Sequence, residues 1–117
     1  MRGMLVVAHG SRREGAHDVF RSMVTEAAQR SQTLVEAAFL EFSDETISWG
    51  LNRLTGRGAT RIEVLPYFLF EGVHTREDIR EQTDRFCLKH PGVEVEYGDV
   101  FGSDPRILTI LEDRIRG

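Results

Sequence analysis

Three side chains that can bind a metal ion or accept a proton lie at the ends of apolar segments of the sequence. His9 and Glu41 are the last residues of two such segments, and His74 follows a third. Two imidazoles and one carboxylate favour Co²⁺, Fe²⁺, Ni²⁺ or Zn²⁺ over Mg²⁺ and Cu⁺. No local motif such as His-Glu-x-x-His joins them, so from the residues alone a purely structural role stays open.

The segments that must position these side chains alternate between strand and helix patterns. The predicted strands are Met4 to His9, Val35 to Glu41, Arg61 to Phe70 and Val93 to Val100. Each is followed by a helical pattern, and we expect the helices to start at Ala16, Ser43, Thr75 and Ser103, the last three as caps or capping boxes. This order predicts an α/β fold. It is a single three-layer domain over residues 1–117, in which a mostly parallel four-stranded sheet carries helices on both faces.

The last predicted helix shows a clear apolar stripe. At helical spacing its apolar residues are Ile107, Leu108, Ile110, Leu111 and Ile115. We expect this stripe to pack against the sheet. In open parallel sheets, ligands bind at the carboxyl ends of the strands, and this rule brings His9, Glu41 and His74 to one edge.

Composition excludes several classes of protein. The formal net charge is −4, whereas a general nucleic-acid binder is expected to show a basic face. One cysteine cannot form an internal disulfide framework, no apolar run approaches the roughly 20 residues of a membrane helix, and no secretory signal pattern is present. We therefore expect a cytoplasmic protein that binds neither nucleic acid nor membranes.

Four segments carry a resemblance to a known family: LVVAHGSR, AFLE, GATRIEVLPYFLFEGVHTREDI and HPGVEVEYGDVFGSDPRI. Together they closely resemble the small CbiX-type sirohydrochlorin cobaltochelatases, a family that also includes the ferrochelatases of sirohaem synthesis. The resemblance covers nearly the whole chain, and PYFLFEGVH is its most specific part. It implies ATP-independent insertion of a divalent metal into sirohydrochlorin, an octacarboxylate tetrapyrrole, in cobalamin or sirohaem biosynthesis. The expected metal substrate is Co²⁺, with Fe²⁺ and Ni²⁺ as alternatives, and no tightly bound cofactor is implied.

The resemblance also implies roles for particular residues. His9 and His74 correspond to the metal-binding and proton-accepting histidines, and Glu41 to a third metal ligand. The residues expected to contact the tetrapyrrole are Ser11, Arg12, Arg13, Tyr67, Phe68, Phe70, Gly72, Val73 and Arg76. The arginines would bind carboxylates beside helix N-termini, and the aromatic residues would form a wall for the flat ring. Without the resemblance, the run from Tyr67 to Phe70 is more typical of a strand buried on both faces.

Other polar residues are expected to be structural. We expect His17 to be exposed on the first helix, His90 to favour the C-terminus of the third helix as a cation, and Cys87 to be a small core residue. Glu41 has a simpler alternative as the cap of the turn that follows it.

Two other functions are compatible with the sequence. The first is a binding protein that carries a metal or tetrapyrrole without turnover. A phosphate-transferring histidine enzyme is less consistent with the sequence, because Ala8 stands where an arginine usually precedes the histidine.

A single sheet edge leaves a wide ring largely in water, so we expect a homodimer that encloses it between two copies.

Overall fold

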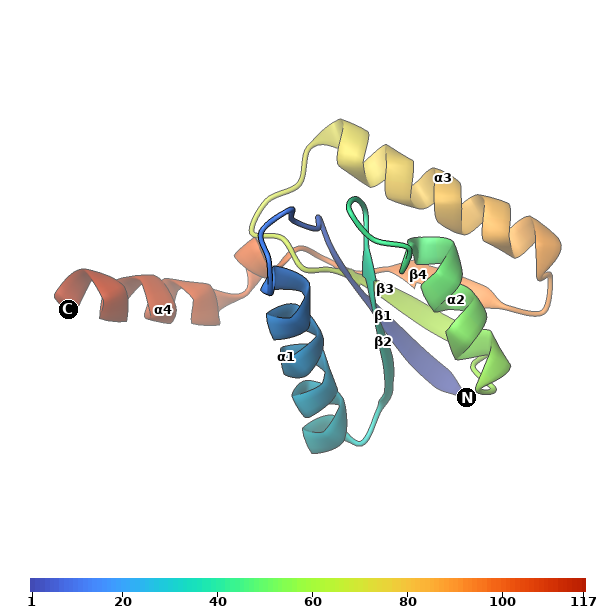
Figure 1. Ribbon diagram of the computed structural model, residues 1–117, viewed down its shortest axis with the longest axis horizontal. Coiled ribbons are helices and arrows are strands. Elements are labelled where there is room, and N and C mark those ends of the chain that lie inside the picture. The colour runs from blue at the N-terminus through green and yellow to red at the C-terminus, as the bar shows by residue number, and fades with distance from the viewer.

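The computed structural model describes residues 1–117 and shows a four-stranded parallel sheet (Figure 1). Its strands, in spatial order, are β2 (Leu34–Phe39), β1 (Arg2–Ala8), β3 (Arg61–Pro66) and β4 (Glu94–Tyr97). The central strand β1 pairs with both neighbours, and Val7 is level with Ala38 on one side and Pro66 on the other. The predicted α/β class, parallel sheet and βαβαβαβα order are confirmed.

Two helices cover one face of the sheet. They are α2 (Ile47–Gly56) and α3 (Val73–Lys89), and between them and the sheet lies the main core, which includes Leu5, Val7, Leu51, Leu54 and Ile79. Helix α2 approaches β1 closely at Gly50, where an added Cβ would lie 2.4 Å from Leu5 Cδ1. Because successive side chains of a strand point to opposite faces of the sheet, Leu5 and Val7 of β1 both point into this layer.

The opposite face carries only α1 (Ala16–Ser31), which packs on the edge strand β2. Its buried residues Phe20 and Val24 form a small second core with Phe39. Not every apolar residue of α1 is buried, since Val19 is 71% exposed. This face of the sheet is thus covered over β2 and left open farther along.

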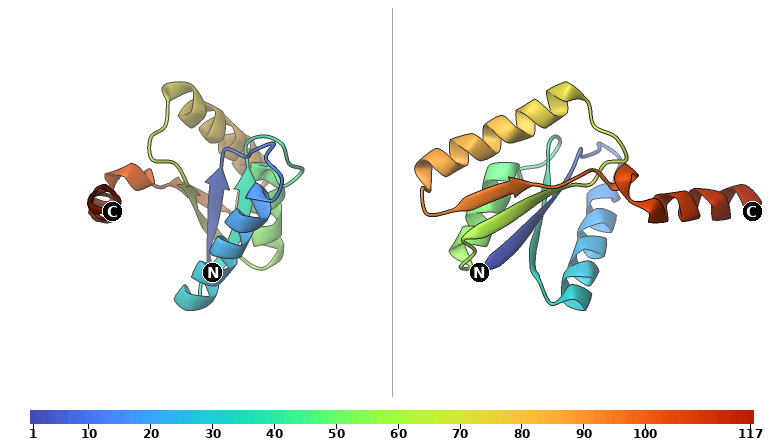
Figure 2. Two further views of the ribbon diagram at one scale, coloured as in Figure 1. Left: turned by 60° about the vertical axis from the view of Figure 1, so that its left-hand side comes forward. Right: turned by 180° about the vertical axis from the view of Figure 1, so that it is seen from behind.

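Helix α4 (Pro105–Arg116) follows a short 3₁₀ turn, η1 (Phe101–Ser103), and projects away from the body (Figures 1 and 2). It accounts for the elongated outline of 50 × 32 × 30 Å. None of its residues is buried. The expectation that its apolar stripe packs against the sheet is therefore wrong for the isolated chain. No helix is long and apolar enough to span a membrane.

Three predicted helix starts are also wrong by a few residues. Helix α2 begins after Thr46, whose side chain accepts a hydrogen bond from the amide of Trp49, whereas Ser43 caps a tight turn by accepting from Glu45 N. Helix α3 begins earlier than Thr75, at Val73. The cap of α4 is Asp104, which accepts from Arg106 N. At α2 and α4 two capping residues stand close together, and the later one caps the helix, whereas Gly72 at the start of α3 provides no side-chain cap.

Candidate active site

The carboxyl edge of the sheet brings His9 and Glu41 side by side. Beyond the ends of β1 and β2, the amide of Leu40 donates to Ala8 O at 3.0 Å and the amide of Glu41 donates to His9 O at 2.9 Å. Parallel pairing thus continues one step past the strands. Both side chains are exposed, so they are presented at the surface of this edge, as predicted from the strand ends.

Glycine at position 10 permits this close approach. Gly10 has φ +96°, and a Cβ there would lie 2.1 Å from the carbonyl oxygen of Glu41. Any other residue would meet both a disfavoured backbone conformation and a backbone clash. The His9-Gly10 pair is therefore what allows the first loop to lie against the second.

The imidazole of His9 stacks on the ring of Phe68, with centroids 4.1 Å apart and planes 23° from parallel. Phe68 is buried, and its carbonyl accepts a hydrogen bond from Phe101 N at 2.8 Å. Phe68 thus supports the histidine rather than forming an open wall. By contrast, Phe70 is exposed and stays available to a ligand, whereas the partly exposed Tyr67 ring packs against Phe20 and Phe101, with centroids 5.3 and 4.8 Å apart.

The segment Tyr67 to Phe70 is not part of a strand, which corrects the prediction of a strand from Arg61 to Phe70. Strand β3 ends at Pro66, and Tyr67 N makes the last hydrogen bond to β1, to Val7 O at 2.7 Å. The chain then leaves the sheet, which lets Phe68 turn inward beneath His9 while Phe70 is 84% exposed.

His74 lies in the first turn of α3, and its side chain is exposed. Figure 1 shows the start of α3 on the same side of the molecule as the ends of β1 and β2. Gly72 and Val73, at the start of this helix, are exposed as well. The preceding residue, Glu71, accepts a hydrogen bond from the hydroxyl of Tyr97 on β4, at 2.5 Å. Burial and this hydrogen bond to Glu71 raise the pKa of Tyr97 well above the usual range of tyrosine.

Arg76 is held beside this pair. Its Nε lies 4.0 Å from Glu71 Oε1, and its guanidinium lies 5.4 Å from the centre of the Tyr97 ring. A ligand carboxylate would therefore share Arg76 with Glu71. Sequence reasoning missed Glu71 and Tyr97, although Glu71 stands within the segment FEGVH next to the predicted histidine.

The loop after β1 carries the other predicted anion-binding residues. The Arg12 guanidinium lies 4.8 Å from the ring centre of Phe42, a residue whose φ of +62° is rare for a bulky side chain. Arg13 is exposed, and its amide donates to Ser11 Oγ at 3.0 Å, so the Ser11 hydroxyl helps to shape the loop. These two arginines lie beside the His9 end of the edge.

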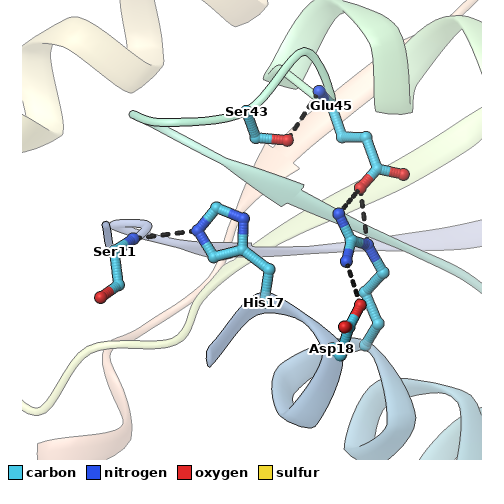
Figure 3. Close-up of polar contacts among 6 residues, drawn as sticks. Ser11, His17, Asp18, Ser43 and Glu45 are labelled. Carbon is cyan, nitrogen blue, oxygen red and sulfur yellow. Dashed lines mark hydrogen bonds and ion pairs between the residues drawn. The ribbon is translucent and has the colours of Figure 1, made fainter. Parts of the chain in front are cut away.

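His17 has a structural role that corrects its expected exposure. It is half-buried, its ring stacks on Phe39 at 4.0 Å, and its Nε2 accepts a hydrogen bond from Ser11 N at 2.9 Å (Figure 3). His17 therefore positions the loop that follows His9. The position of His17 on the helix did not predict this contact, because the contact depends on how the loop after β1 folds back over α1.

A second contact fastens α1 to the loop between β2 and α2. Arg21 donates from Nε to Glu45 Oε1 at 2.6 Å and from NH1 to Asp18 Oδ1 at 3.0 Å. Figure 3 shows both contacts, with Glu45 and Asp18 labelled. Together with His17, this ion pair holds both loops that carry His9 and Glu41. Sequence reasoning missed it as well.

His9, Glu41 and His74 share an edge but do not form a closed metal site within one chain. No group of three or more His, Cys, Asp or Glu side chains is close enough together to hold a metal ion. The side chains are instead exposed donors on separate loops. Such an arrangement suits transient contact with an ion or a proton.

Comparison with known proteins shows the family to which the chain belongs. The CbiX family model matches residues 3–117. The chain belongs to the CbiX family. Among curated relatives, a sirohydrochlorin ferrochelatase from Priestia megaterium is 37% identical over 98% of this chain and 44% of its own length. A sirohydrochlorin cobaltochelatase from Saccharolobus solfataricus is 34% identical over 98% of this chain and 94% of its own length.

The fold matches that of a solved sirohydrochlorin chelatase. The sirohydrochlorin chelatase SirB from Bacillus subtilis subspecies spizizenii, determined in complex with cobalt, superposes with a TM-score of 0.86 at 28% identity, over 98% of this chain and 50% of SirB. This CbiX chain thus spans about half the length of SirB and of the Priestia relative. It nearly equals the Saccharolobus relative in length.

Proposed function

We propose that this chain catalyses the ATP-independent insertion of a divalent metal ion, Co²⁺ in the first place, into sirohydrochlorin. The observation that carries the proposal is the match of nearly the whole chain to relatives named sirohydrochlorin chelatases, one of them of almost the same length. The exposed imidazoles of His9 and His74 at one edge of the sheet supply the chemistry that such a reaction needs.

Metal insertion exchanges two protons for one ion. The two pyrrole N–H protons leave the ring as the ion gives up water and binds the four ring nitrogens. Neutral imidazoles of His9 and His74 accept these protons and guide the ion, and the Glu41 carboxylate offers a further oxygen ligand. Because none of these donors is enclosed, the ion keeps open coordination positions and passes on to the ring.

The substrate is polyanionic, and the site offers local positive charge on an acidic chain. Arg12 and Arg13 follow His9, and Arg76 lies beyond His74. We assign them to the ring carboxylates, with Tyr67 and Phe70 against its flat surface. Arg12 and Arg13 are the stronger candidates because Arg76 already lies near Glu71.

Iron is the alternative metal, favoured by the relative named a ferrochelatase at 37% identity. Nickel is a third candidate. Imidazole and carboxylate donors bind all three ions, and their affinities follow a general order that is independent of the protein. Turnover rates measured with each metal therefore decide which ion is physiological. The ion in turn indicates the cobalamin or the sirohaem pathway.

The working form in this proposal is a homodimer. In a single chain the candidate donors are exposed and do not gather around an ion, and a ring bound there would leave one face in water. A two-fold pair would place His9 and His74 of both copies around one cleft. Relatives about twice as long as this chain are consistent with two such halves in one polypeptide.

Matched histidine substitutions test the site. His9→Asn and His74→Asn are expected to lower the rate of Co²⁺ insertion by about 10²–10⁴-fold, the usual contribution of a positioned acid or base. His90→Asn, at the other end of α3, serves as the control and keeps its rate. Rates are measured by the absorbance change of sirohydrochlorin, and circular dichroism checks the fold. A His9→Asn/His74→Asn double variant with full activity would reject the assignment.

A further inference from the structure

Phe42 has a backbone conformation that is unfavourable for its side chain. Its φ of +62° lies in the left-handed region, which glycine, asparagine and aspartate adopt far more readily than a bulky aromatic residue. The one other non-glycine residue with a positive φ is Gln32, at the C-terminal end of α1, where this conformation is common. Phe42 stands at no helix end, so its conformation needs another explanation.

The turn between β2 and α2 imposes this conformation. Phe39 N donates to Glu45 O at 2.8 Å and closes the turn around Phe42. Directly before Phe42, Glu41 N donates to His9 O at 2.9 Å and fixes the backbone against the first loop. Glycine, asparagine or aspartate would take up this conformation with less strain. A phenylalanine here therefore indicates a role for its side chain outside the turn, as strained residues often have at ligand sites.

The ring of Phe42 is directed to the surface rather than into the core. The residue is 49% exposed and belongs to neither hydrophobic cluster of the protein. It directly follows Glu41, and Figure 1 shows this turn beside the loop after β1, at the carboxyl edge of the sheet. An exposed, strained aromatic residue next to a candidate metal ligand indicates contact with a ligand of this edge.

Arg12 lies over this exposed ring. Its guanidinium carbon is 4.8 Å from the ring centre of Phe42, and Arg12 forms no salt bridge with any carboxylate of the chain. Arg76, by contrast, lies 4.0 Å from Glu71. A guanidinium over an aromatic face still has N–H groups to donate to a carboxylate. Phe42 and Arg12 thus present an apolar ring and a free cation side by side.

We propose that Phe42 is a further substrate-contact residue, whose ring packs against the tetrapyrrole while Arg12, held over Phe42, binds a carboxylate on the rim of the same molecule. A flat apolar ring edged by carboxylates carries both of these chemistries at a short separation. Phe42 therefore also positions Arg12 for this carboxylate. The inference rests on the proposed function for the identity of the ligand, but not on turnover.

Binding of metal-free sirohydrochlorin to the full chain, followed by its fluorescence, tests this contact. Phe42→Asn is expected to raise the dissociation constant about 10-fold, the effect of losing one aromatic contact. Its midpoint of urea unfolding should be at least that of the wild type, because asparagine tolerates the left-handed backbone. Phe42→Tyr keeps the ring and should bind within about twofold of the wild type. Leu88→Asn removes an apolar side chain that is 85% exposed on α3 and, as the matched control, should bind like the wild type.

A double variant tests whether Phe42 and Arg12 act together. Arg12→Gln alone should weaken binding, because the carboxylate loses its cation. If Phe42 positions Arg12, Arg12→Gln/Phe42→Asn should lose less affinity than the product of the two single losses. Losses that multiply in full would reject the positioning of Arg12 by Phe42.

The outcomes separate this inference from the proposed activity. Phe42→Asn that binds sirohydrochlorin as tightly as the wild type would overturn the contact, and so would a loss of binding that only accompanies a loss of stability. A wild-type chain that does not bind sirohydrochlorin would reject both the contact and the proposed function. A chain that binds the ring with the expected Phe42 dependence but does not metalate it would reject the catalysis and support the contact.

Discussion

At the scale of single residues, the imidazole of His9 is positioned entirely by neighbours that leave its nitrogens free. Phe68 supports the ring, and Glu41 N holds the backbone through the His9 carbonyl. Gly10 allows the two loops to meet. The position of a candidate catalytic histidine thus depends on a buried aromatic ring and on a glycine with no chemistry of its own.

Gly10→Ala is therefore expected to damage both stability and site. Its left-handed backbone alone costs about 1–3 kcal/mol for a non-glycine residue, and the clash with Glu41 O adds to this. Gly56→Ala, where a Cβ meets nothing within 4 Å at the end of α2, is the control and should gain about 0.4–1 kcal/mol. Urea unfolding measures both, and equal stability of the two variants would contradict the account of Gly10.

Tyr97 and Glu71 hold the start of the helix that carries His74. Tyr97→Phe removes the donated hydroxyl and is expected to cost about 1 kcal/mol at neutral pH. Because the pKa of Tyr97 is raised in the folded state by burial and by Glu71, this contribution is complete below pH 10 and is lost as pH rises through the raised pKa.

Two measurements check the role of Tyr97. Urea unfolding of the wild type and Tyr97→Phe should show a constant difference from pH 6 to 9 that shrinks above pH 10. An ultraviolet titration should show a late-ionising phenol in the wild type that is missing from the variant. A wild type whose two tyrosines both ionise at the ordinary pKa would count against this hydrogen bond.

At the scale of elements, hydrophobic periodicity was sufficient for the order of strands and helices and for the edge at which the histidines appear. It was insufficient where local signals compete. Ser43 and Thr46 are both capping residues, and the hydrogen bond of Phe39 N to Glu45 O selects the later one by first closing a turn. The apolar run after Pro66 is equally consistent with a longer strand, and only the packing of Phe68 under His9 takes it out of the sheet.

Contacts between distant segments could not be predicted from one sequence. Nothing in its helical position places His17 against Phe39, and nothing near Glu71 indicates that Tyr97 is its partner. The apolar stripe of α4 was predicted correctly, but periodicity shows only that one face of the helix is expected to pack against another apolar surface. It does not say whether that partner belongs to the same chain.

Helix α4 is expected to be ordered only when its apolar face is covered. In hydrogen exchange, α4 amides of the wild type at high concentration should be protected, whereas those of Leu111→Asp should exchange as in a short isolated helix. Helix α3, which packs on the main core through Ile79 and Phe86, is the internal reference and should not change. Equal protection of α4 in both proteins would show that the helix needs no second chain.

At the scale of the whole molecule, the chain leaves two kinds of surface open. The candidate donors lie open at the carboxyl edge, and the apolar face of α4 and an apolar groove beside α1 lie open as well. The Priestia relative and SirB are about twice as long as this chain. In the homodimer proposed above, the second copy would complete the substrate cleft.

Multiple-turnover metal insertion tests the central claim most directly. Purified full-length chain is mixed with a large excess of sirohydrochlorin and with Co²⁺, Fe²⁺ or Ni²⁺ in turn, and the absorbance change is compared with the reaction without protein. We expect many rings metalated per chain with at least one ion, Co²⁺ first, and a rate that falls when His9 or His74 is replaced. Metalation no faster than the uncatalysed reaction with all three ions, or a change that stops at one ring per site, would contradict the account and identify a carrier.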